Sequence, residues 1–366
     1  MEKRTADLCH EKIEILLTDA LKKQVFSACS IGYLRIREGV TESNIFHYGY
    51  AGKEERVCPV DERTVFDLAS LTKPLVTSLS MLALLEDNNI NIDQNITDFF
   101  KLSTPDKKKI TLFHLLTHSS GLPAHRPYYK KLLSLSCEKR MDSLMEWILG
   151  ENLLFQPGSE NIYSDLGFML LGKIIEKVSG HSLDEYWQSK IAQPLYLEND
   201  LFFASKQKNE YRVYAATGEC SWSKTRLYGK VNDDNCRALG GVAGHAGLFG
   251  TAKAVLTMGE NILLQYRGRR HHCSYSSQTL RTALNRRKGN WRFGFDTPSA
   301  GLSSSGNCYS DLSIGHLGFT GTSFWIDLQR EIVIVLLTNR VLCGEDLTPI
   351  KRLRPLVHDA LMENLL

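Results

Sequence analysis

The sequence predicts an α/β protein of the α+β type, with one antiparallel sheet built from both chain ends, helices flanking it, and an inserted, mainly helical lobe. Strand-like alternation lies near each end of the 366-residue chain, and helical periodicity broken by Gly and Pro dominates the middle. Hydrophobic residues make up 43% and charged residues 23% of the chain, which is typical of a globular protein with a large core.

The N-terminal part predicts a helix followed by two strands. Residues 8–26 have an amphipathic pattern, and "SIGYLRIRE" (30–38) and "NIFHYGYAG" (44–52) read as strands. The segment "GVTES" (39–43) between them is expected to form the turn.

The C-terminal part predicts a stronger hairpin over 322–340, with its turn near Leu328–Arg330, followed by a helix over 348–366. In the second arm, residues 332–337 are apolar on both faces. A strand of this kind is covered on both sides, so we expect helices on each face of the sheet.

Between these ends, helical patterns recur over 73–87, 111–118, 141–149, 166–178 and 253–265. The sequence therefore predicts a sheet domain made of residues 1–66 and 255–366, and a helical domain made of residues 67–254. A cleft between two such domains is a common ligand site.

Composition excludes several function classes. The net charge of +3 gives no strong field for a polyanion, and the sequence contains no P-loop, so no nucleic-acid partner is expected. No apolar run has the length of a membrane span, and the N-terminus has no continuous apolar leader. Nine scattered cysteines without a CxxC pair fit a reducing, cytoplasmic location. "HHC" (271–273) has no second ligand cluster in the sequence, so it is expected to be surface, with no metal and no cofactor.

Ser70 and Lys73, in "FDLASLTKPLVTSLSMLALLED" (66–87), are the first candidate for chemistry. Residues three apart on a helix are neighbours, so the lysine can reach the hydroxyl and, with a pKa lowered by burial, serve as its base. The S-x-x-K pattern also occurs at 136–139, 205–208 and 221–224, but only Ser70 opens a helix with a sustained leucine stripe. The alternative is a Ser N-cap with Lys73 extending to water.

Two further segments fit a reactive site. Tyr163, Ser164 and Asp165 follow a Pro-Gly turn and precede the helix predicted at 166–178. "GHLGFTGTSFWID" (315–327) is a glycine-rich entry into the C-terminal hairpin. The alternatives are a helix cap at Ser164 or Asp165 and a strand start that needs glycine for a tight turn.

With "ITLFHLLTHSSGLP" (110–123) and "ALGGVAGHAGLFGTA" (238–252), these segments resemble the serine β-lactamase and penicillin-binding protein superfamily. The match is nearest to its class C-like branch and runs from about Thr64 to Asn339. The resemblance implies a serine hydrolase that works through an acyl-enzyme, without metal or cofactor. By this resemblance, Ser70 is the nucleophile, Lys73 is its partner in proton transfer, and Tyr163 is a general base or proton relay.

The resemblance also implies a substrate-binding set, namely Asp165, His316, Gly318, Phe319 and His245. In it the N–H groups of Ser70 and Phe319 form an oxyanion hole. His245 lies in the glycine-rich loop, where a histidine bonded to backbone carbonyls is the alternative. His118 is expected to fix the loop after its own helix.

Two positions depart from the family pattern: Asp165 replaces the usual asparagine, and Leu317 the usual threonine. An anionic ligand then meets fewer donors and an added negative charge. We therefore expect weak or no β-lactamase activity, and a small ester, a D-amino-acid peptide or a muropeptide fragment as substrate.

The competing hypothesis is a catalytically silent scaffold or binding protein on the same fold. Such a protein is expected to lose the nucleophile and its partners first, and Ser70, Lys73 and Tyr163 are all present.

Overall fold

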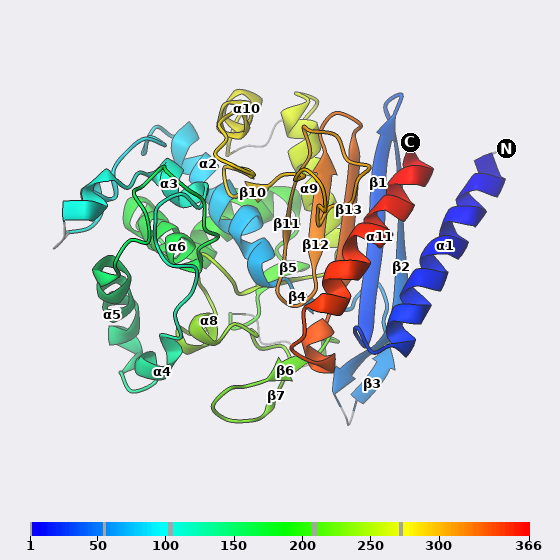
Figure 1. Ribbon diagram of the computed structural model, residues 1–366, viewed down its shortest axis with the longest axis horizontal. Coiled ribbons are helices and arrows are strands. Elements are labelled where there is room, and N and C mark those ends of the chain that lie inside the picture. Colours follow the sequence, from blue (N-terminus) through cyan, green and yellow to red (C-terminus); the bar gives the residue numbers. More distant parts are fainter. Residues whose placement is uncertain (1, 54–55, 102–104, 207–210, 271–273) are drawn as a thin grey trace.

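The computed structural model describes residues 2–53, 56–101, 105–206, 211–270 and 274–366. An eight-stranded antiparallel sheet fills the right-hand half of the molecule (Figure 1), in the order β3-β2-β1-β13-β12-β11-β10-β9. Its strands are β1 (Ala28–Arg37), β2 (Val40–Lys53), β3 (Arg56–Pro59), β9 (Trp291–Arg292), β10 (Phe295–Asp296), β11 (Ile314–Leu317), β12 (Ser323–Asp327) and β13 (Ile332–Thr338). Because β1 pairs with β13, strands from both ends of the chain share one sheet. The predicted fold class is confirmed.

Both predicted hairpins are present. The N-terminal turn lies at Glu38 and Gly39, whose φ angles are +52° and +81°. Most of "GVTES" is therefore strand rather than turn, because Val40 already pairs with Arg37. The C-terminal turn lies between β12 and β13, close to the predicted position.

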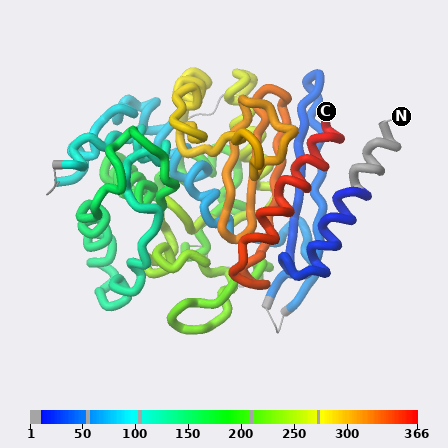
Figure 2. Tube along the Cα trace, in the orientation of Figure 1, coloured from blue at the N-terminus to red at the C-terminus, as the bar shows by residue number. Residues whose placement is uncertain are grey.

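Helices cover both faces of the sheet, as the apolar pattern of residues 332–337 predicted. Ile332, Ile334 and Leu336 pack in the cluster that includes α1 (Glu2–Lys22) and α11 (Thr348–Leu365). Val333 and Val335 pack on the other face, in the larger core with α9 (Ala252–Tyr266). The helices α1 and α11 lie side by side at the edge of the molecule (Figure 2).

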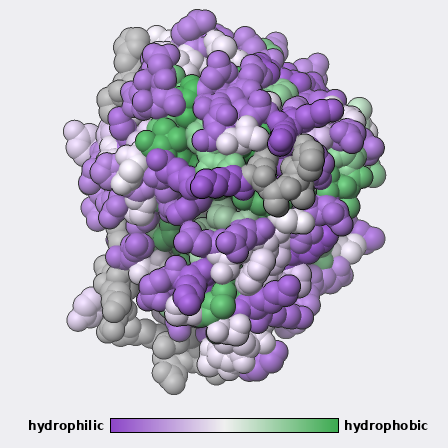
Figure 3. Space-filling model, turned by 90° about the vertical axis from the view of Figure 1, so that its left-hand side faces the viewer, coloured by the Kyte–Doolittle hydropathy of each residue, from purple (hydrophilic) through white to green (hydrophobic). Residues whose placement is uncertain are grey.

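The left-hand half of the molecule in Figure 1 is mainly helical. It contains α3 (Leu112–Leu116), α4 (Tyr129–Leu132), α5 (Cys137–Gly150), α6 (Asp165–Ser179) and α8 (Asp234–Ala238), while α10 (Ser277–Asn285) lies above the centre. The short helix α7 (Leu183–Trp187) packs against α6. A small sheet of β4 (Phe66–Asp67), β8 (Leu248–Gly250) and β5 (Leu201–Phe203) and a hairpin of β6 (Thr217–Glu219) and β7 (Arg226–Leu227) complete the fold. The outer face of this half is mostly hydrophilic, with small apolar patches (Figure 3). The domain boundaries and the cleft stay a prediction.

The helix after Ser70 is not the single α-helix that the leucine stripe predicted. A 3₁₀ turn (Ala69–Leu71) and a π-helical turn (Lys73–Ser78) precede α2 (Leu79–Glu86). Pro74 has no N–H to donate and its ring disturbs the preceding turn. The indole of Trp187 donates to the carbonyl of Leu75 at 2.8 Å, which provides a partner for a helix carbonyl. Such π-turns are frequent at functional sites.

Among the described residues, no helix combines the length and apolar character needed to cross a membrane. The "HHC" segment at 271–273 lies outside the described residues, so the expectation that it is surface stays a prediction.

Candidate active site

A strained turn presents Ser70. Ala69, directly before it, has a φ of +47°, a conformation that costs a residue with a side chain on the order of 1–3 kcal/mol. The buried carboxylate of Asp67 holds this turn, accepting from the backbone N–H of Ala69 at 2.9 Å and of Asn232 at 2.7 Å. Burial raises the pKa of Asp67 to about 6, although these two hydrogen bonds oppose the shift. The Ser70 side chain is left partly exposed.

The glycine-rich end of β11 is fastened to the same turn. The hydroxyls of Thr320 and Thr322 donate to the carbonyls of Asp67 and Leu68 at 2.7 and 3.2 Å. Gly318 fits between these groups because a Cβ there would lie 2.0 Å from Thr322 Oγ1 and 2.8 Å from the Leu68 carbonyl oxygen. The predicted third segment is thus brought next to Ser70.

Lys73 is fully buried, and its Nζ has three acceptors. It donates to Ser70 Oγ at 2.9 Å, to Asp165 Oδ1 at 2.7 Å and to the carbonyl oxygen of His245 at 3.1 Å. Three donors on one nitrogen are those of an ammonium group. The structure therefore joins the predicted nucleophile and its lysine, and it holds the lysine in its charged form.

The charge of Lys73 depends mainly on Asp165. Burial acts to lower the pKa of Lys73, but the carboxylate of Asp165 and the nearby Tyr163 outweigh it and raise the pKa. The expectation that the pKa of Lys73 is lowered is wrong. Asp165 stands where the family usually has asparagine, and its carboxylate stabilises the ammonium form of the lysine. Burial also acts to raise the pKa of Asp165, but Lys73 and His125 hold it well below its usual range.

Tyr163 lies beside the ammonium group, with Lys73 Nζ 4.7 Å from its ring centre. Its ring packs against His118, Trp291 and His316, with ring centres 4.6, 5.6 and 5.8 Å away. Burial raises the pKa of Tyr163, although Lys73 opposes the shift, so at neutral pH the side chain is a phenol.

At the start of α6, Ser164 caps the helix and Asp165 contacts Lys73. Ser164 caps the helix, since its hydroxyl oxygen accepts from the N–H of Gly167 at 3.3 Å. Asp165 is thereby free to turn toward Lys73. The ring of His118 accepts from the N–H of Ser164 at 3.0 Å, which ties the 110–123 segment to this turn.

The two predicted binding histidines have buried side chains. His316 donates through Nδ1 to the carbonyl of Leu317 at 2.8 Å, and burial lowers its pKa to about 3, so it is neutral. His245 Nε2 lies 2.9 Å from Asp233 Oδ1, and His245 faces Lys73 with its carbonyl oxygen. Phe319, by contrast, is 50% exposed, and Arg340 Nε donates to its carbonyl at 2.7 Å.

Sequence reasoning missed three residues of the site. His125 contacts Asp165, Trp291 packs on Tyr163, and Asp67 holds the turn before Ser70. None of them belongs to a motif or a periodic pattern. Only Asp67 carried a usable signal, a carboxylate in an otherwise apolar stretch three residues before the serine.

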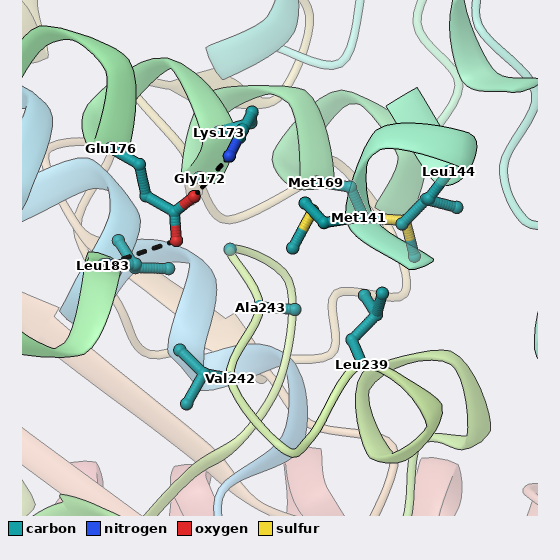
Figure 4. Close-up of a pocket in the computed structure, with 11 residues that line it drawn as sticks. Met141, Leu144, Met169, Gly172, Lys173, Glu176, Leu183, Leu239, Val242 and Ala243 are labelled. Atoms are coloured by element: carbon teal, nitrogen blue, oxygen red, sulfur yellow. Dashed lines mark hydrogen bonds and ion pairs between the residues drawn. The ribbon is translucent and has the colours of Figure 1, made fainter. Parts of the chain in front are cut away.

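A small cavity lies between α5, α6 and residues Leu239–Gly244 of the glycine-rich loop (Figure 4). Its volume of about 10 Å³ is no more than one water needs. Its walls are mainly apolar, with the Lys173–Glu176 ion pair at one side. The cavity includes neither Ser70 nor Lys73 and is too small for a substrate.

Comparison with known proteins identifies the family. The β-lactamase family model matches residues 37–356. The chain is 31% identical over 336 residues to the N-acetylmuramyl-L-alanine amidase of Bacillus subtilis (strain 168). This alignment covers 80% of this chain and 73% of the amidase. It is 30% identical over 306 residues to a putative D-alanyl-D-alanine carboxypeptidase of Escherichia coli (strain K12), covering 76% and 69% of the two chains.

Solved structures agree on the fold. EstCE1, a hydrolase with promiscuous acyltransferase activity, superimposes with a TM-score of 0.73 at 22% identity, covering 97% of this chain and 98% of EstCE1. A class C β-lactamase superimposes with a TM-score of 0.73 at 16% identity, covering 98% of each chain. The chain therefore belongs to the β-lactamase family and is a serine hydrolase of its β-lactamase-related branch.

Proposed function

We propose that Ser70 is the nucleophile of a hydrolase that forms an acyl-enzyme with a small ester, a D-amino-acid peptide or a muropeptide fragment. The contact of 2.9 Å between Lys73 Nζ and Ser70 Oγ, next to the strained turn at Ala69, is the observation that carries the proposal. A serine hydroxyl needs such a neighbour to be activated. Tyr163, beside both groups, is the second residue for proton transfer.

Two N–H groups are proposed as the oxyanion hole, those of Ser70 and Phe319. The segment that carries Phe319 is held in place, because Gly318 donates to the carbonyl of Thr322 at 2.7 Å and Arg340 holds the Phe319 carbonyl. Donors that are fixed before the reaction stabilise the developing oxyanion without reorganisation.

We infer the substrate class from the groups beside Ser70. The side chains of Leu317 and Phe319 are apolar and accessible, His316 is neutral, and Asp165 is an anion. Asp165 already pairs with the Lys73 ammonium and the Phe319 carbonyl with Arg340, so among these groups a substrate carboxylate next to the scissile bond finds no unpaired positive charge. An amide or ester with a neutral group at that position fits better, and the name of the amidase relative supports an amide in a wall fragment.

The proposal is tested by the intact mass of the protein after reaction with a fluorophosphonate probe. One adduct on the wild-type chain and none on Ser70→Ala is the expected result, because only an activated serine attacks the probe. Folded protein without an adduct would contradict the proposal and favour the silent scaffold. Esters, D-alanyl anilides and muropeptides are then compared as substrates of the active chain.

Leu317→Thr is expected to speed acylation by a β-lactam by at least about tenfold, since a hydrogen bond to a charged group is worth roughly 1.5–3 kcal/mol. The half-buried side chain of residue 317 has room for the smaller threonine. The rate of acylation is followed by mass spectrometry with a penicillin, and Leu317→Val serves as the matched variant without the hydroxyl. An equal rate for the threonine and valine variants would argue against carboxylate binding at this position.

A further inference from the structure

His125 lies on the exposed side of the site and shares Asp165 with Lys73. Its Nδ1 is 3.3 Å from Asp165 Oδ2, while Asp165 Oδ1 is 2.7 Å from Lys73 Nζ. The His125 side chain is 48% exposed, whereas Lys73 is fully buried. One carboxylate thus bridges a buried amine and an imidazole in contact with water.

The chain holds His125 in this position from both sides. The carbonyl of Ala124 accepts from the N–H of Asp165 at 2.9 Å, and the carbonyl of Arg126 accepts from the side-chain amide of Asn235 at 2.8 Å. Arg126 itself is paired with Glu151 at 3.2 Å. His125 is therefore placed by its neighbours and is not an accidental contact of a free loop.

Lys73 cannot act as a base in the arrangement described above. An ammonium group that donates three hydrogen bonds has no lone pair for the proton of Ser70. A neutral amine can keep its bonds to Asp165 and to the His245 carbonyl and turn its lone pair toward Ser70. The obstacle is Asp165, which stabilises the charged form.

We propose that His125 is a second proton-holding residue of the site, which carries the proton that Lys73 releases and so gives Asp165 another cationic partner. The inference rests on the proposed function. In the active form His125 is protonated, Asp165 is an anion and Lys73 is a neutral amine, so the total charge equals that of the resting form. The proton of Ser70 then moves to Lys73 Nζ as Oγ bonds to the reacting carbon.

The charges around His125 stabilise its protonated state and so lower the cost of taking a proton from Lys73, which is the stronger base. Asp165 in α6 and Asp233 and Asp234 at the start of α8 are its negative neighbours, and Arg126, the next residue, and Lys73, on the other side of Asp165, are its positive ones. The hydrogen bond to Asp165 raises the pKa of His125, against the effect of burial. Imidazole is the side chain whose charge changes most readily near neutral pH.

The test measures the rate of fluorophosphonate labelling against pH, a reaction in which Ser70 Oγ bonds to phosphorus, fluoride leaves, and Lys73 takes the proton. The wild-type rate is expected to rise with pH near neutrality and then level off. For His125→Gln we expect a rate at pH 7.5 at least about tenfold lower, because a neighbouring charge shifts a pKa by about 1–3 units. Its rate should rise only at alkaline pH.

Asp165→Asn in the His125→Gln background supplies the decisive comparison. His125 is needed only because Asp165 is negative, so this double variant is expected to regain the rate at neutral pH. His181→Gln, an exposed histidine before α7, is the matched control and should keep the wild-type profile. Melting temperatures verify that each variant is folded.

A wild-type profile for His125→Gln would overturn the inference, as would a slow, folded His125→Gln that Asp165→Asn does not restore. Both results leave the proposed function intact, because Ser70 is still labelled. Absence of labelling on the wild-type chain would instead overturn the proposed function, and this inference with it.

Discussion

Lys73→Met is expected to slow acylation of Ser70 by about 10²–10⁴-fold, the usual contribution of general acid–base catalysis. Methionine fills the fully buried volume of the lysine side chain but can neither give nor take a proton. The rate of adduct formation with a fluorophosphonate measures the effect directly. If the variant reacted at the wild-type rate, Lys73 would not take part in the proton transfer.

The same substitution also leaves Asp165 without its ammonium partner. Breaking a buried ion pair from one side costs on the order of 3–5 kcal/mol, and less here because Asp165 keeps 16% of its side-chain surface exposed and has His125 as a second partner. The double variant Lys73→Met with Asp165→Asn removes the unpaired charge. It should recover the free energy of unfolding and stay slow, which separates the catalytic from the structural role of the lysine.

Acid is expected to weaken the fold through three histidines that are buried in the neutral form. Burial lowers the pKa of His316 and of His358 to about 3, and that of His118 well below its usual value. In the unfolded chain each has a pKa near 6.5, so the unfolded state binds more protons as the pH falls. Stability from these groups is complete above about pH 6.5 and is lost progressively down to about pH 3.

The size of the loss follows from the same pKa values. For each pH unit below about 6.5, His316 and His358 each lower the free energy of unfolding by about 1.4 kcal/mol. Together they lower it by roughly 5 kcal/mol at pH 4.5. The buried carboxyls of Asp67 and Asp296 oppose this loss, because burial raises their pKa values to about 6 and about 7 and the folded state therefore takes up their protons first. Guanidinium unfolding at pH 7 and pH 4.5, compared between the wild-type chain and a variant that lacks one of these histidines, measures the histidine contribution.

His358→Gln isolates one of these contributions away from Ser70. His358 lies in α11, where its Nε2 contacts Ser323 Oγ at 3.0 Å and its Nδ1 the carbonyl of Ser304 at 3.2 Å. The variant should lose stability at pH 7 but show a smaller further loss at pH 4.5. The exposed His181→Gln serves as its control, and an unchanged difference between the two pH values in His358→Gln would contradict the assignment.

Local patterns were enough to predict the sheet. The alternation over 30–38 and 332–337 depends on residues close in the chain, and both strands are present and paired with each other. The spacing of Ser70 and Lys73 predicted their contact for the same reason, and it survives although the helix that carries them is not regular. The irregularity depends on Pro74 and on a distant indole, which periodicity does not encode.

The sequence by itself determined the family, the sheet and the contact between Ser70 and Lys73, because each depends on neighbours in the chain or on motifs in a fixed order. Only the tertiary structure decided the charge of the site. Asp165 is 92 residues from Lys73 and the His245 carbonyl 172 residues, yet these contacts, with burial, hold the lysine as an ammonium. A pKa depends on distance and desolvation, and the order of residues along the chain specifies neither until the chain is folded.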